Sequence, residues 1–558
     1  MFLSEPTVER DIPDDQPTSL SDLLHRSVEA YGERRALITL DAQYSYRDLA
    51  ELANRYARAL VAGGAGKGSR VALLMENDPH WVAFAFGATS IGALLVPIST
   101  FVHRDDLAYQ LAHEDVEHLF MSAGFLDNDY SSMLAEIVPE IAQPQLGRLF
   151  CRELPALHSV VVRGADELPA GCRDWDDFLA SGDDVSESKV RALQAATGPE
   201  DECYLLATSG TTARPKGVLH THGAIAGNGS LIGDYQGLCP EDVVWFYFPL
   251  FFSAGCINVM VGTLSHGAAL ILQPSFDAGL ALELIERERA TTWHLWLHQL
   301  NQLLEHPDWN TRDHSGLHKG TGPYDVLCET PPPDGLGGVN MYGMTETATA
   351  FSCTRADEPL DIRMNTQGHL LPGNEIEVRD PETGARLPVG ETGEFHVKGP
   401  SVMRGYDKVD PTTVFDAEGF FATGDLGRVD ADGRVHFEQR RKDVIKTGGI
   451  NVSPAEVEAS LVRIPGVDAA YVFGLADDDK GELVGATLVP EPGASLDETT
   501  VTEFCRAELP GYKRPKAVLV LTPDAVPMTG SGKVTKHVLR DRLLRALDRG
   551  AGPFVDER

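Results

Sequence analysis

The residues of this chain best suited to chemistry lie in the segment Thr208–Gly217, which reads Thr-Ser-Gly-Thr-Thr-Ala-Arg-Pro-Lys-Gly. The apolar run Cys203–Ala207 before it is typical of a buried strand, and Gly210 with Pro215 would break any regular element that followed. Hydroxyls and backbone N–H groups can wrap a polyphosphate, and Lys216 can supply a point charge. The segment predicts a phosphate-binding loop, although a solvated turn between two strands has the same composition.

Further motifs follow in order along the chain. They are Tyr342–Thr347 (Tyr-Gly-Met-Thr-Glu-Thr), Thr423–Asp425 (Thr-Gly-Asp), the stretch Arg440–Pro454, and Pro527–Lys533 (Pro-Met-Thr-Gly-Ser-Gly-Lys). Each motif is a weak signal alone, but the series with the first loop resembles the adenylate-forming (AMP-binding, ANL) superfamily. This superfamily includes acyl-CoA synthetases, luciferases and the adenylation domains of peptide synthetases. The resemblance covers about residues 20 to 545 and favours the acyl-CoA synthetase, or carboxylate–CoA ligase, type.

The resemblance implies a site in which ATP and Mg²⁺ activate a carboxylic acid as acyl-AMP, with release of pyrophosphate. Such a site must hold two anions together, so electrostatics dominates its design. Thr345 would contact the α-phosphate, Glu346 would hold Mg²⁺, and the catalytic Lys533 would bridge the carboxylate and the α-phosphate. The residues implied in ATP binding are Thr208, Ser209, Gly210, Thr211, Thr212, Lys216, Tyr342, Gly343, Asp425 and Arg440. Among them Tyr342 would stack on the adenine, and Asp425 would accept hydrogen bonds from the ribose hydroxyls.

The resemblance also implies a second half-reaction, in which the acyl group passes to coenzyme A as co-substrate. A small C-terminal domain is then expected to rotate about a hinge at Lys442. This rotation would withdraw the catalytic lysine and present Lys446, Gly448 and Gly449 along the path of the CoA thiol. The cationic run Lys513–Lys516 could meet the phosphates of CoA, but such a run is more often a solvated loop.

The acyl pocket implied by the resemblance contains two departures from the family pattern. Its residues are Phe251, Phe252, Gly320, Thr321 and Gly322. Phe252 stands where histidine is usual, which makes this wall more apolar, and Thr321 and Gly322 alter a motif that commonly reads Gly-Gly-Ala-Pro. No acidic residue near Phe252 could pair an α-ammonium, which argues against amino acids. The pattern favours a fatty, alicyclic, aromatic or steroid-side-chain acid. Trp293 and Trp296 suit either a core or the pocket lining.

The histidines and cysteines do not predict a metal centre. His294 and His298 have the spacing of a metal pair, but they lack the glutamate of the zincin motif and follow a strand pattern. His220 and His222, just after the phosphate loop, suit structural roles better. The eight cysteines include no Cys-x-x-Cys pair, so neither a zinc site nor a disulfide framework is indicated, and a reducing cytoplasm fits best.

The elements that must position these motifs alternate between helix and strand. Residues 17 to 110 show this rhythm, which recurs after residue 200 and predicts an α/β fold with doubly wound parallel sheets. From about 365 to 440, closely spaced strands predict a β-barrel-like lobe. The rest predicts a small α+β domain. We therefore expect an N-terminal adenylation domain over residues 1–441, which binds ATP and the acyl group, and a mobile C-terminal domain over 442–558 that carries Lys533.

Composition narrows the expected partners. The chain has 558 residues, with 48 basic against 83 acidic, and its net charge of −35 disfavours nonspecific binding to nucleic acid or anionic membrane. The uncharged stretch Trp81–Ile98 is interrupted by polar residues and glycines, so a buried helix turning at Gly92 into a strand is expected rather than a transmembrane segment. The N-terminus lacks a signal peptide pattern, which favours a cytoplasmic location. The expected partners are a small carboxylic acid, ATP and coenzyme A, and a homodimer is compatible with the sequence.

Two alternatives stay open at this point. One is an acyl-AMP ligase that delivers its acyl group to a carrier protein or an amine; the lack of an appended carrier domain favours coenzyme A instead. The other is a nucleotide-binding homologue that does not turn over. The presence of Lys533, Glu346 and Asp425 counts against it.

Overall fold

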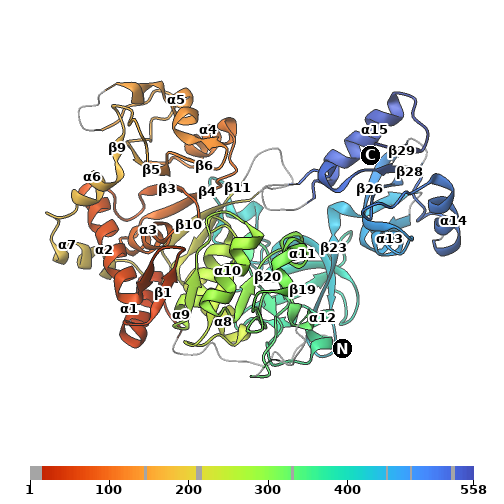
Figure 1. Ribbon diagram of the computed structural model, residues 1–558, viewed down its shortest axis with the longest axis horizontal. Coiled ribbons are helices and arrows are strands. Elements are labelled where there is room, and N and C mark those ends of the chain that lie inside the picture. The colour runs from red at the N-terminus through yellow and green to blue at the C-terminus, as the bar shows by residue number, and fades with distance from the viewer. Residues whose placement is uncertain are drawn as a thin grey trace. The chain divides into compact units, whose positions relative to one another are not determined.

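The structure is a computed structural model of the chain (Figure 1). It describes residues 16–143, 148–208, 216–327, 332, 334–447, 450–477, 480–509, 511–528 and 534–557. The described residues form two compact units. The first unit contains the chain up to residue 376 together with 396–422 and 430–436, and the second contains 377–395, 423–429 and 437 onward. The predicted boundary between residues 441 and 442 falls inside the second unit and stays a prediction.

The first unit contains a large sheet whose central strands are parallel. Its order is β21-β11-β10-β4-β3-β5-β8-β9. The bounds are β3 (Arg70–Leu74), β4 (Leu94–Ile98), β5 (His118–Ser122), β8 (Ser159–Arg163), β9 (Arg173–Asp174), β10 (Glu202–Thr208), β11 (Lys216–Thr221) and β21 (Gly405–Tyr406). The central strands are continuous apolar runs because helices cover them on both faces.

The helices after β3 and β4 leave the sheet on opposite faces. Helix α3 (Pro79–Ser90) packs in one core with Leu73 and Leu95, whereas α4 (Arg104–His113) packs in another with Leu74 and Val96. The polypeptide turns from α3 into β4 at Gly92, whose φ is +76°. This confirms the buried helix and strand expected between residues 81 and 98. Among the described residues, no helix is both long and apolar enough to cross a bilayer.

A second sheet in the first unit repeats the same arrangement. Its order is β15-β14-β12-β13-β1-β2, with β1 (Arg35–Ile38), β2 (Gln43–Ser45), β12 (Val243–Phe246), β13 (Ala269–Ile271), β14 (Thr292–His294) and β15 (Lys319–Gly320). The π-helix η2 (Ala254–Val261) packs on the face that contains Phe246, and α10 (Ala278–Glu288) packs on the face that contains Trp245. Helices on both faces of largely parallel sheets confirm the predicted doubly wound α/β fold.

The first unit also contains further helices and several short strands. The helices are α1 (Leu20–Tyr31), α2 (Tyr46–Ala62), α5 (Tyr130–Ile137), η1 (Pro139–Ala142), α6 (Trp175–Ala180), α7 (Glu187–Ala195), α8 (His222–Gln236), α9 (Gly262–Ser265), α11 (Leu297–Glu305), η3 (Pro307–Asn310), η4 (Tyr324–Leu327), η5 (Thr345–Thr347), α12 (Leu360–Asn365) and η6 (Pro411–Thr413). The strands are β6 (Gly124–Phe125), β7 (Asn128–Asp129), β16 (Met341–Tyr342), β17 (Ser352–Cys353) and β18 (His369–Leu370). In the region predicted to be barrel-like, a sheet has the order β19-β20-β22-β23, with β19 (Glu375–Arg379), β20 (Gly393–Lys398), β22 (Phe421–Val429) and β23 (Val435–Arg440).

The C-terminal part of the second unit is a separate α+β core, as predicted. Its sheet has the order β25-β24-β27-β28-β29, and β26 pairs with β27. The strands are β24 (Ile445–Thr447), β25 (Ile450–Val452), β26 (Val467–Asp477), β27 (Gly481–Pro490), β28 (Ala517–Val520) and β29 (Phe554–Asp556); the helices are η7 (Arg441–Asp443), α13 (Pro454–Leu461), α14 (Glu498–Glu508), η8 (Pro523–Ala525) and α15 (Lys536–Asp548). Helices α13 and α14 cover one face of the sheet, and α15 covers the other (Figure 1).

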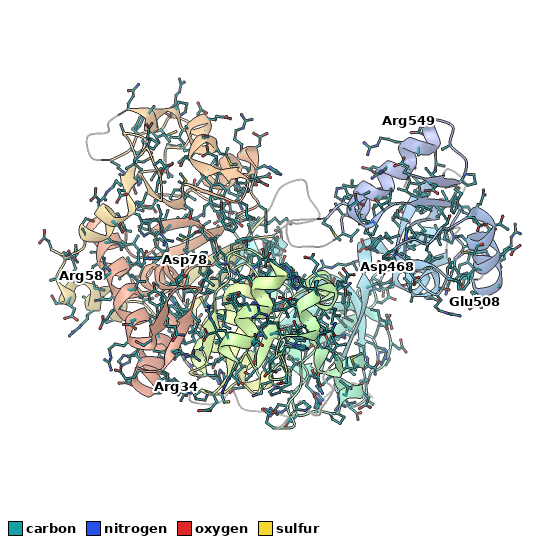
Figure 2. The ribbon with its side chains drawn as sticks, in the orientation of Figure 1. Arg34, Arg58, Asp78, Asp468, Glu508 and Arg549 are labelled. Atoms are coloured by element: carbon teal, nitrogen blue, oxygen red, sulfur yellow. The ribbon has the colours of Figure 1, made fainter. Side chains whose placement is uncertain are left out.

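The charged side chains lie mostly at the surface. Arg34 and Glu508 are exposed, and each forms an ion pair, with Glu241 at 3.3 Å and with Arg463 at 2.6 Å respectively (Figure 2). Exposed pairs of this kind contribute about 0–1 kcal/mol. Apolar cores therefore hold the fold, and the polar groups that are buried call for a separate explanation.

Candidate active site

The predicted phosphate loop connects two antiparallel strands of the large sheet. Strand β10 confirms the strand expected at Cys203–Ala207, and Thr208 at its end is the register partner of Lys216 at the start of β11. Ser209, Gly210, Thr211 and Thr212 lie outside the described residues. The exposed Lys216 ammonium lies 4.7 Å from the centroid of the Tyr406 ring, a cation–π contact.

Tyr406 connects this lysine to the predicted magnesium ligand. Strand β21, which contains Tyr406, pairs with β11. The Tyr406 hydroxyl donates to Glu346 Oε1 at 2.8 Å. Burial, followed by the Glu346 carboxylate, raises the pKa of Tyr406, so the phenol stays protonated as a donor. Lys216, Tyr406 and Glu346, which are far apart in the sequence, thus form one continuous cluster.

The Glu346 carboxylate fits a magnesium ion that also binds phosphate. It is 9 % exposed, and its backbone carbonyl accepts from the N–H of Met403 at 2.8 Å, which fixes the main chain. One hydrogen bond to a carboxylate oxygen leaves several lone pairs for a metal. Mg²⁺ is usually held by one or two protein carboxylates together with substrate phosphates. The described residues contain no cluster of three or more potential metal ligands.

The turn that carries Thr345 and Glu346 is held in an unusual backbone conformation. Ala348 and Thr349, directly after it, have φ angles of +47° and +79°. Left-handed conformations cost non-glycine residues about 1–3 kcal/mol and persist where surrounding contacts enforce them. Here the buried Asn228 of α8 donates from Nδ2 to the carbonyls of Ala348 and Ala350, both at 2.9 Å.

His220 supports the same turn from the other side. Its Nε2 donates to the Thr345 carbonyl at 2.7 Å. Burial lowers the pKa of His220 to about 4, so the ring is neutral near pH 7. This contact is the structural role that the sequence suggested for His220.

Tyr342 and Gly343 lie just before this turn. Tyr342 is buried in β16, and its carbonyl accepts from the N–H of Phe351 at 2.7 Å. A Cβ at Gly343 would lie 2.1 Å from the carbonyl oxygen of Thr349, so only glycine fits there. The predicted residues from Tyr342 to Glu346 therefore share one tightly packed turn.

Aromatic side chains form the wall predicted for the acyl pocket. The rings of Phe251 and Phe252 have centroids 4.5 Å apart, and Phe252 lies 6.4 Å from Trp296. Trp293 instead packs in the core beside α10, in line with the alternation of side chains along β14. Trp296 is half-buried and also packs against a hydrophobic core, the one that contains Phe248.

The glycine motif that follows β15 lies against β14. A Cβ at Gly320 would lie 1.8 Å from the Trp293 carbonyl oxygen, and φ at Gly320 is +126°, so this position requires glycine. Gly322 also has positive φ, at +90°. Thr321 between them is half-buried, and its hydroxyl lies 2.9 Å from His294 Nδ1. His294 thus bonds to the predicted pocket, a contact that the sequence reading did not anticipate.

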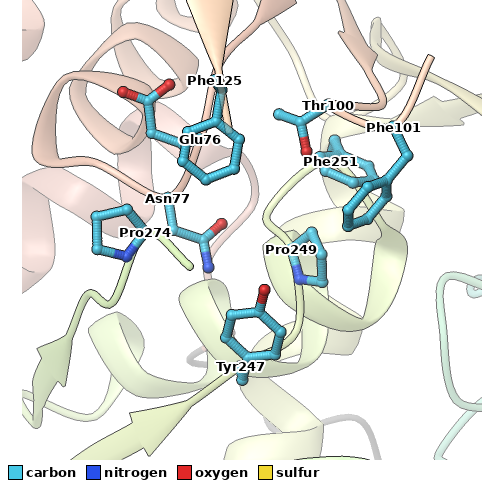
Figure 3. Close-up of a pocket in the computed structure, with 9 residues that line it drawn as sticks. All are labelled: Glu76, Asn77, Thr100, Phe101, Phe125, Tyr247, Pro249, Phe251 and Pro274. Atoms are coloured by element: carbon cyan, nitrogen blue, oxygen red, sulfur yellow. The ribbon is translucent and has the colours of Figure 1, made fainter. Parts of the chain in front are cut away.

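A cavity lies next to Phe251, at the carboxyl ends of strands from both sheets. Figure 3 shows its lining residues, Glu76, Asn77, Thr100, Phe101, Phe125, Tyr247, Pro249, Phe251 and Pro274, with the Tyr247 hydroxyl directed toward the space between them. Asn77 follows β3, Thr100 follows β4, Tyr247 follows β12 and Pro274 follows β13. Strands β3 and β4 are neighbours in the large sheet, and β12 and β13 are neighbours in the second sheet. In each pair, the connections that follow the two strands leave the sheet on opposite faces. Open α/β sheets bind ligands at such points.

In the second unit, Asp425 and Arg440, which were both predicted at the ribose, form an ion pair. Arg440 Nε lies 2.7 Å from Asp425 Oδ1, and Asp425 is 1 % exposed. The positive φ of Gly424, +73°, shapes this turn, and the Thr423 hydroxyl accepts from the N–H of Asp425 at 3.1 Å.

Other predicted residues of the second unit can be placed only in part. Lys442 lies in η7 and Lys446 in β24, but their side chains, together with Gly448, Gly449 and Lys533, lie outside the described residues. Lys513 pairs with Glu456, and Arg514 donates to the Leu509 carbonyl at 2.7 Å. These contacts favour a structural role for the cationic run Lys513–Lys516.

Comparison with known proteins gives two family matches. Residues 24–407 match the model for the AMP-binding enzyme family, and residues 456–533 match the model for the AMP-binding enzyme C-terminal domain. The chain is 32 % identical to the 3-(7a-methyl-1,5-dioxo-octahydro-inden-4-yl)propanoyl:CoA ligase of Rhodococcus jostii, over 94 % of this chain and 99 % of that protein.

Solved structures agree with these matches. ATP-bound MatB from Rhodopseudomonas palustris is 27 % identical, with a TM-score of 0.75 over 94 % of this chain and 98 % of that one. The amide bond synthetase McbA from Marinactinospora thermotolerans is 26 % identical, with a TM-score of 0.75 over 94 % of this chain and 99 % of that one.

Proposed function

The chain belongs to the AMP-binding enzyme family and is an AMP-forming acid–thiol ligase. We propose that it joins an apolar carboxylic acid to coenzyme A with ATP and Mg²⁺. The observation that carries this proposal is the cluster of Lys216, Tyr406 and Glu346. The Lys216 ammonium lies at the start of the strand after the phosphate loop. The Tyr406 side chain contacts both this ammonium and the buried Glu346 carboxylate. This combination suits a magnesium–triphosphate complex.

In the first half-reaction, a carboxylate oxygen of the acid attacks the α-phosphorus of ATP. The bond from that phosphorus to the bridging oxygen breaks, and pyrophosphate leaves with its electron pair. Lys216 and the hydroxyls of the phosphate loop would hold the leaving pyrophosphate, and Thr345 would bind the α-phosphate. Mg²⁺, held by Glu346, would neutralise charge on the phosphates. Lys533 would offset the charge that develops between the carboxylate and the α-phosphate.

In the second half-reaction, the CoA thiolate attacks the acyl carbonyl, and AMP leaves with the former carboxylate oxygen. We propose that the C-terminal domain, residues 442–558, turns about Lys442 between the two steps, so that Lys446, Gly448 and Gly449 border the path of the thiol. Asp425 and Arg440 would bind the ribose, because a carboxylate accepts hydrogen bonds from hydroxyls and Arg440 holds that carboxylate by an ion pair. We further propose a cytoplasmic location, and the homodimer stays a prediction.

For the acid itself we propose a fatty, alicyclic, aromatic or steroid-side-chain class. The aromatic wall of Phe251, Phe252 and Trp296 supports an apolar acyl group. The relative from Rhodococcus jostii, whose name specifies a bicyclic propanoyl group, supports the alicyclic members of this range.

A second candidate function is amide formation, in which an amine accepts the acyl group of the adenylate. The similarity to the amide bond synthetase McbA favours it. The chemistry of the first half-reaction is unchanged in this case, and the two functions differ only in the acceptor.

A panel of carboxylic acids tests both functions. We would measure pyrophosphate release for each acid with ATP and Mg²⁺, with coenzyme A, with an amine mixture and with neither, and identify the products by mass. The proposal predicts a thioester and turnover that depends on coenzyme A. An amide as the main product would favour the second candidate, and no pyrophosphate release from any acid would contradict both.

A further inference from the structure

A series of buried polar side chains reaches from helix α8 to the wall of the predicted acyl pocket. Gln236 donates from Nε2 to Asn258 Oδ1 at 2.7 Å, and Asn258 donates from Nδ2 to Thr321 Oγ1 at 2.9 Å. The Thr321 hydroxyl in turn lies 2.9 Å from His294 Nδ1. Gln236 and His294 are fully buried, and Asn258 is 1 % exposed. A buried polar network is costly unless its members find partners.

The backbone determines which nitrogen of His294 carries the proton. The N–H of Thr321 donates to His294 Nδ1 at 3.2 Å, so Nδ1 must present its lone pair. A backbone N–H can only donate, so this assignment holds whichever way the side-chain amides of the network are turned. Burial lowers the pKa of His294 to about 3, and the neutral ring therefore has its single proton on Nε2 near pH 7.

That Nε2–H finds no acceptor among the residues that the structure describes. An unpaired buried donor normally destabilises a protein, and it is tolerated in a binding site when the ligand supplies the acceptor. The donor therefore suits a ligand that supplies an acceptor.

The position of His294 places this donor beside the aromatic wall. In the register of the sheet, His294 is the partner of Phe246, so its side chain leaves β14 on the face opposite to that of Trp293. Its ring lies 6.2 Å from Phe248, and Phe248 lies 4.9 Å from Trp296, which borders Phe252. Thr321, the other neighbour of His294, belongs to the predicted pocket itself.

We propose that His294 Nε2 donates a hydrogen bond to an oxygen within the acyl group of the substrate, such as a keto, ether or hydroxyl oxygen. The inference rests on the proposed ligase function and narrows its substrate class to acids with an oxygenated hydrocarbon skeleton. The acceptor is not the reacting carboxylate. That carboxylate must reach the triphosphate of ATP, whereas the His294 ring neighbours Phe248 in the aromatic cluster.

Pairs of acids with the same carbon skeleton test this proposal. In each pair, one acid has a keto group where the other has a methylene, and the position of the keto group is varied across the series. We would measure kcat/KM for pyrophosphate release. For the best position, the wild-type enzyme should prefer the keto acid by about tenfold or more, because the parent acid leaves the buried donor unpaired.

His294→Phe should reduce this preference to about one, since phenylalanine fills the space without a donor. His294→Gln, which can still donate, should keep part of the preference. His25→Phe serves as the control for loss of a histidine elsewhere, because His25 is an exposed residue of α1 that pairs with Glu29 at 3.5 Å, and it should leave the ratio between the two acids unaltered.

Several results would overturn the proposal. Equal kcat/KM values for keto and parent acids at every position in the wild type would do so without any variant, even if His294→Phe fails to fold. A preference that survives His294→Phe would show that another group recognises the oxygen. An equal loss for both acids, with an unchanged ratio, would assign His294 to the carboxylate or to the scaffold. If no acid releases pyrophosphate, the ligase function fails as well, which separates that outcome from the others.

Discussion

Tyr406→Phe isolates the contact that connects the phosphate strand to the magnesium ligand. The substitution removes only the hydroxyl that donates to Glu346 at 2.8 Å, and it keeps the ring that Lys216 contacts at 4.7 Å. A hydrogen bond to a charged group contributes about 1.5–3 kcal/mol, which corresponds to a factor of about 10 to 150. Because that bond orients the carboxylate, we expect the Mg²⁺ concentration for half-maximal pyrophosphate release to rise by at least about tenfold.

The assay is a magnesium titration of pyrophosphate release at saturating ATP and acid. Tyr44→Phe, on the edge strand β2, serves as the control for loss of a phenol elsewhere, and its titration should match that of the wild type. An unchanged magnesium dependence in Tyr406→Phe would refute the role assigned to this hydrogen bond. A loss of activity that excess Mg²⁺ cannot reverse would also count against it, since it would point to damage of the turn.

The remaining predictions concern the turn at Glu346, the buried His220 and the proposed role of Lys533. Asn228→Leu should lower the free energy of unfolding in urea by about 2–4 kcal/mol, because the carbonyls of Ala348 and Ala350 lose their donor. An unaltered urea midpoint would contradict the stabilising role of these two hydrogen bonds. His220 has a folded pKa of about 4, below its unfolded value of 6.5, so its contribution to stability is complete above pH 6.5 and is lost as the pH falls toward 4, by about 3 kcal/mol. In His220→Gln this loss of stability at acid pH should be absent when the free energy of unfolding is measured against pH. The same dependence on pH in the variant and the wild type would refute the role given to His220. Lys533→Ala should abolish adenylate formation yet retain thioester formation from a presynthesised acyl-adenylate, whereas equal loss of both would contradict the split roles.

Local patterns predicted much of this molecule. The apolar run Cys203–Ala207, followed by Gly210 and Pro215, predicted the strand before the phosphate loop. Apolar runs and residues that end a strand are both visible in the local sequence. The family resemblance assigned both Asp425 and Arg440 to the ribose, but their ion pair was not predicted. The resemblance to a family, rather than any single residue, made the site assignments specific.

Contacts between distant segments could not be predicted in this way. Tyr406 lies in a two-residue edge strand whose partner, β11, is remote in the sequence, so nothing around it indicates a contact with Glu346. Asn228 reads as an ordinary position in a glycine-rich helix. His294 was considered only for its spacing to His298, whereas its actual partner is Thr321 on the next strand of the sheet. Such roles depend on which strands become neighbours, which local sequence does not determine.

The central claim is that the carboxylate attacks ATP and that AMP later leaves with one of its oxygens. The most direct measurement uses an accepted acid labelled with oxygen-18 in both carboxylate oxygens, followed by mass spectrometry of the products. The account predicts one labelled oxygen in AMP, one in the thioester and none in pyrophosphate. Unlabelled AMP, or label in any other phosphate product, would contradict it.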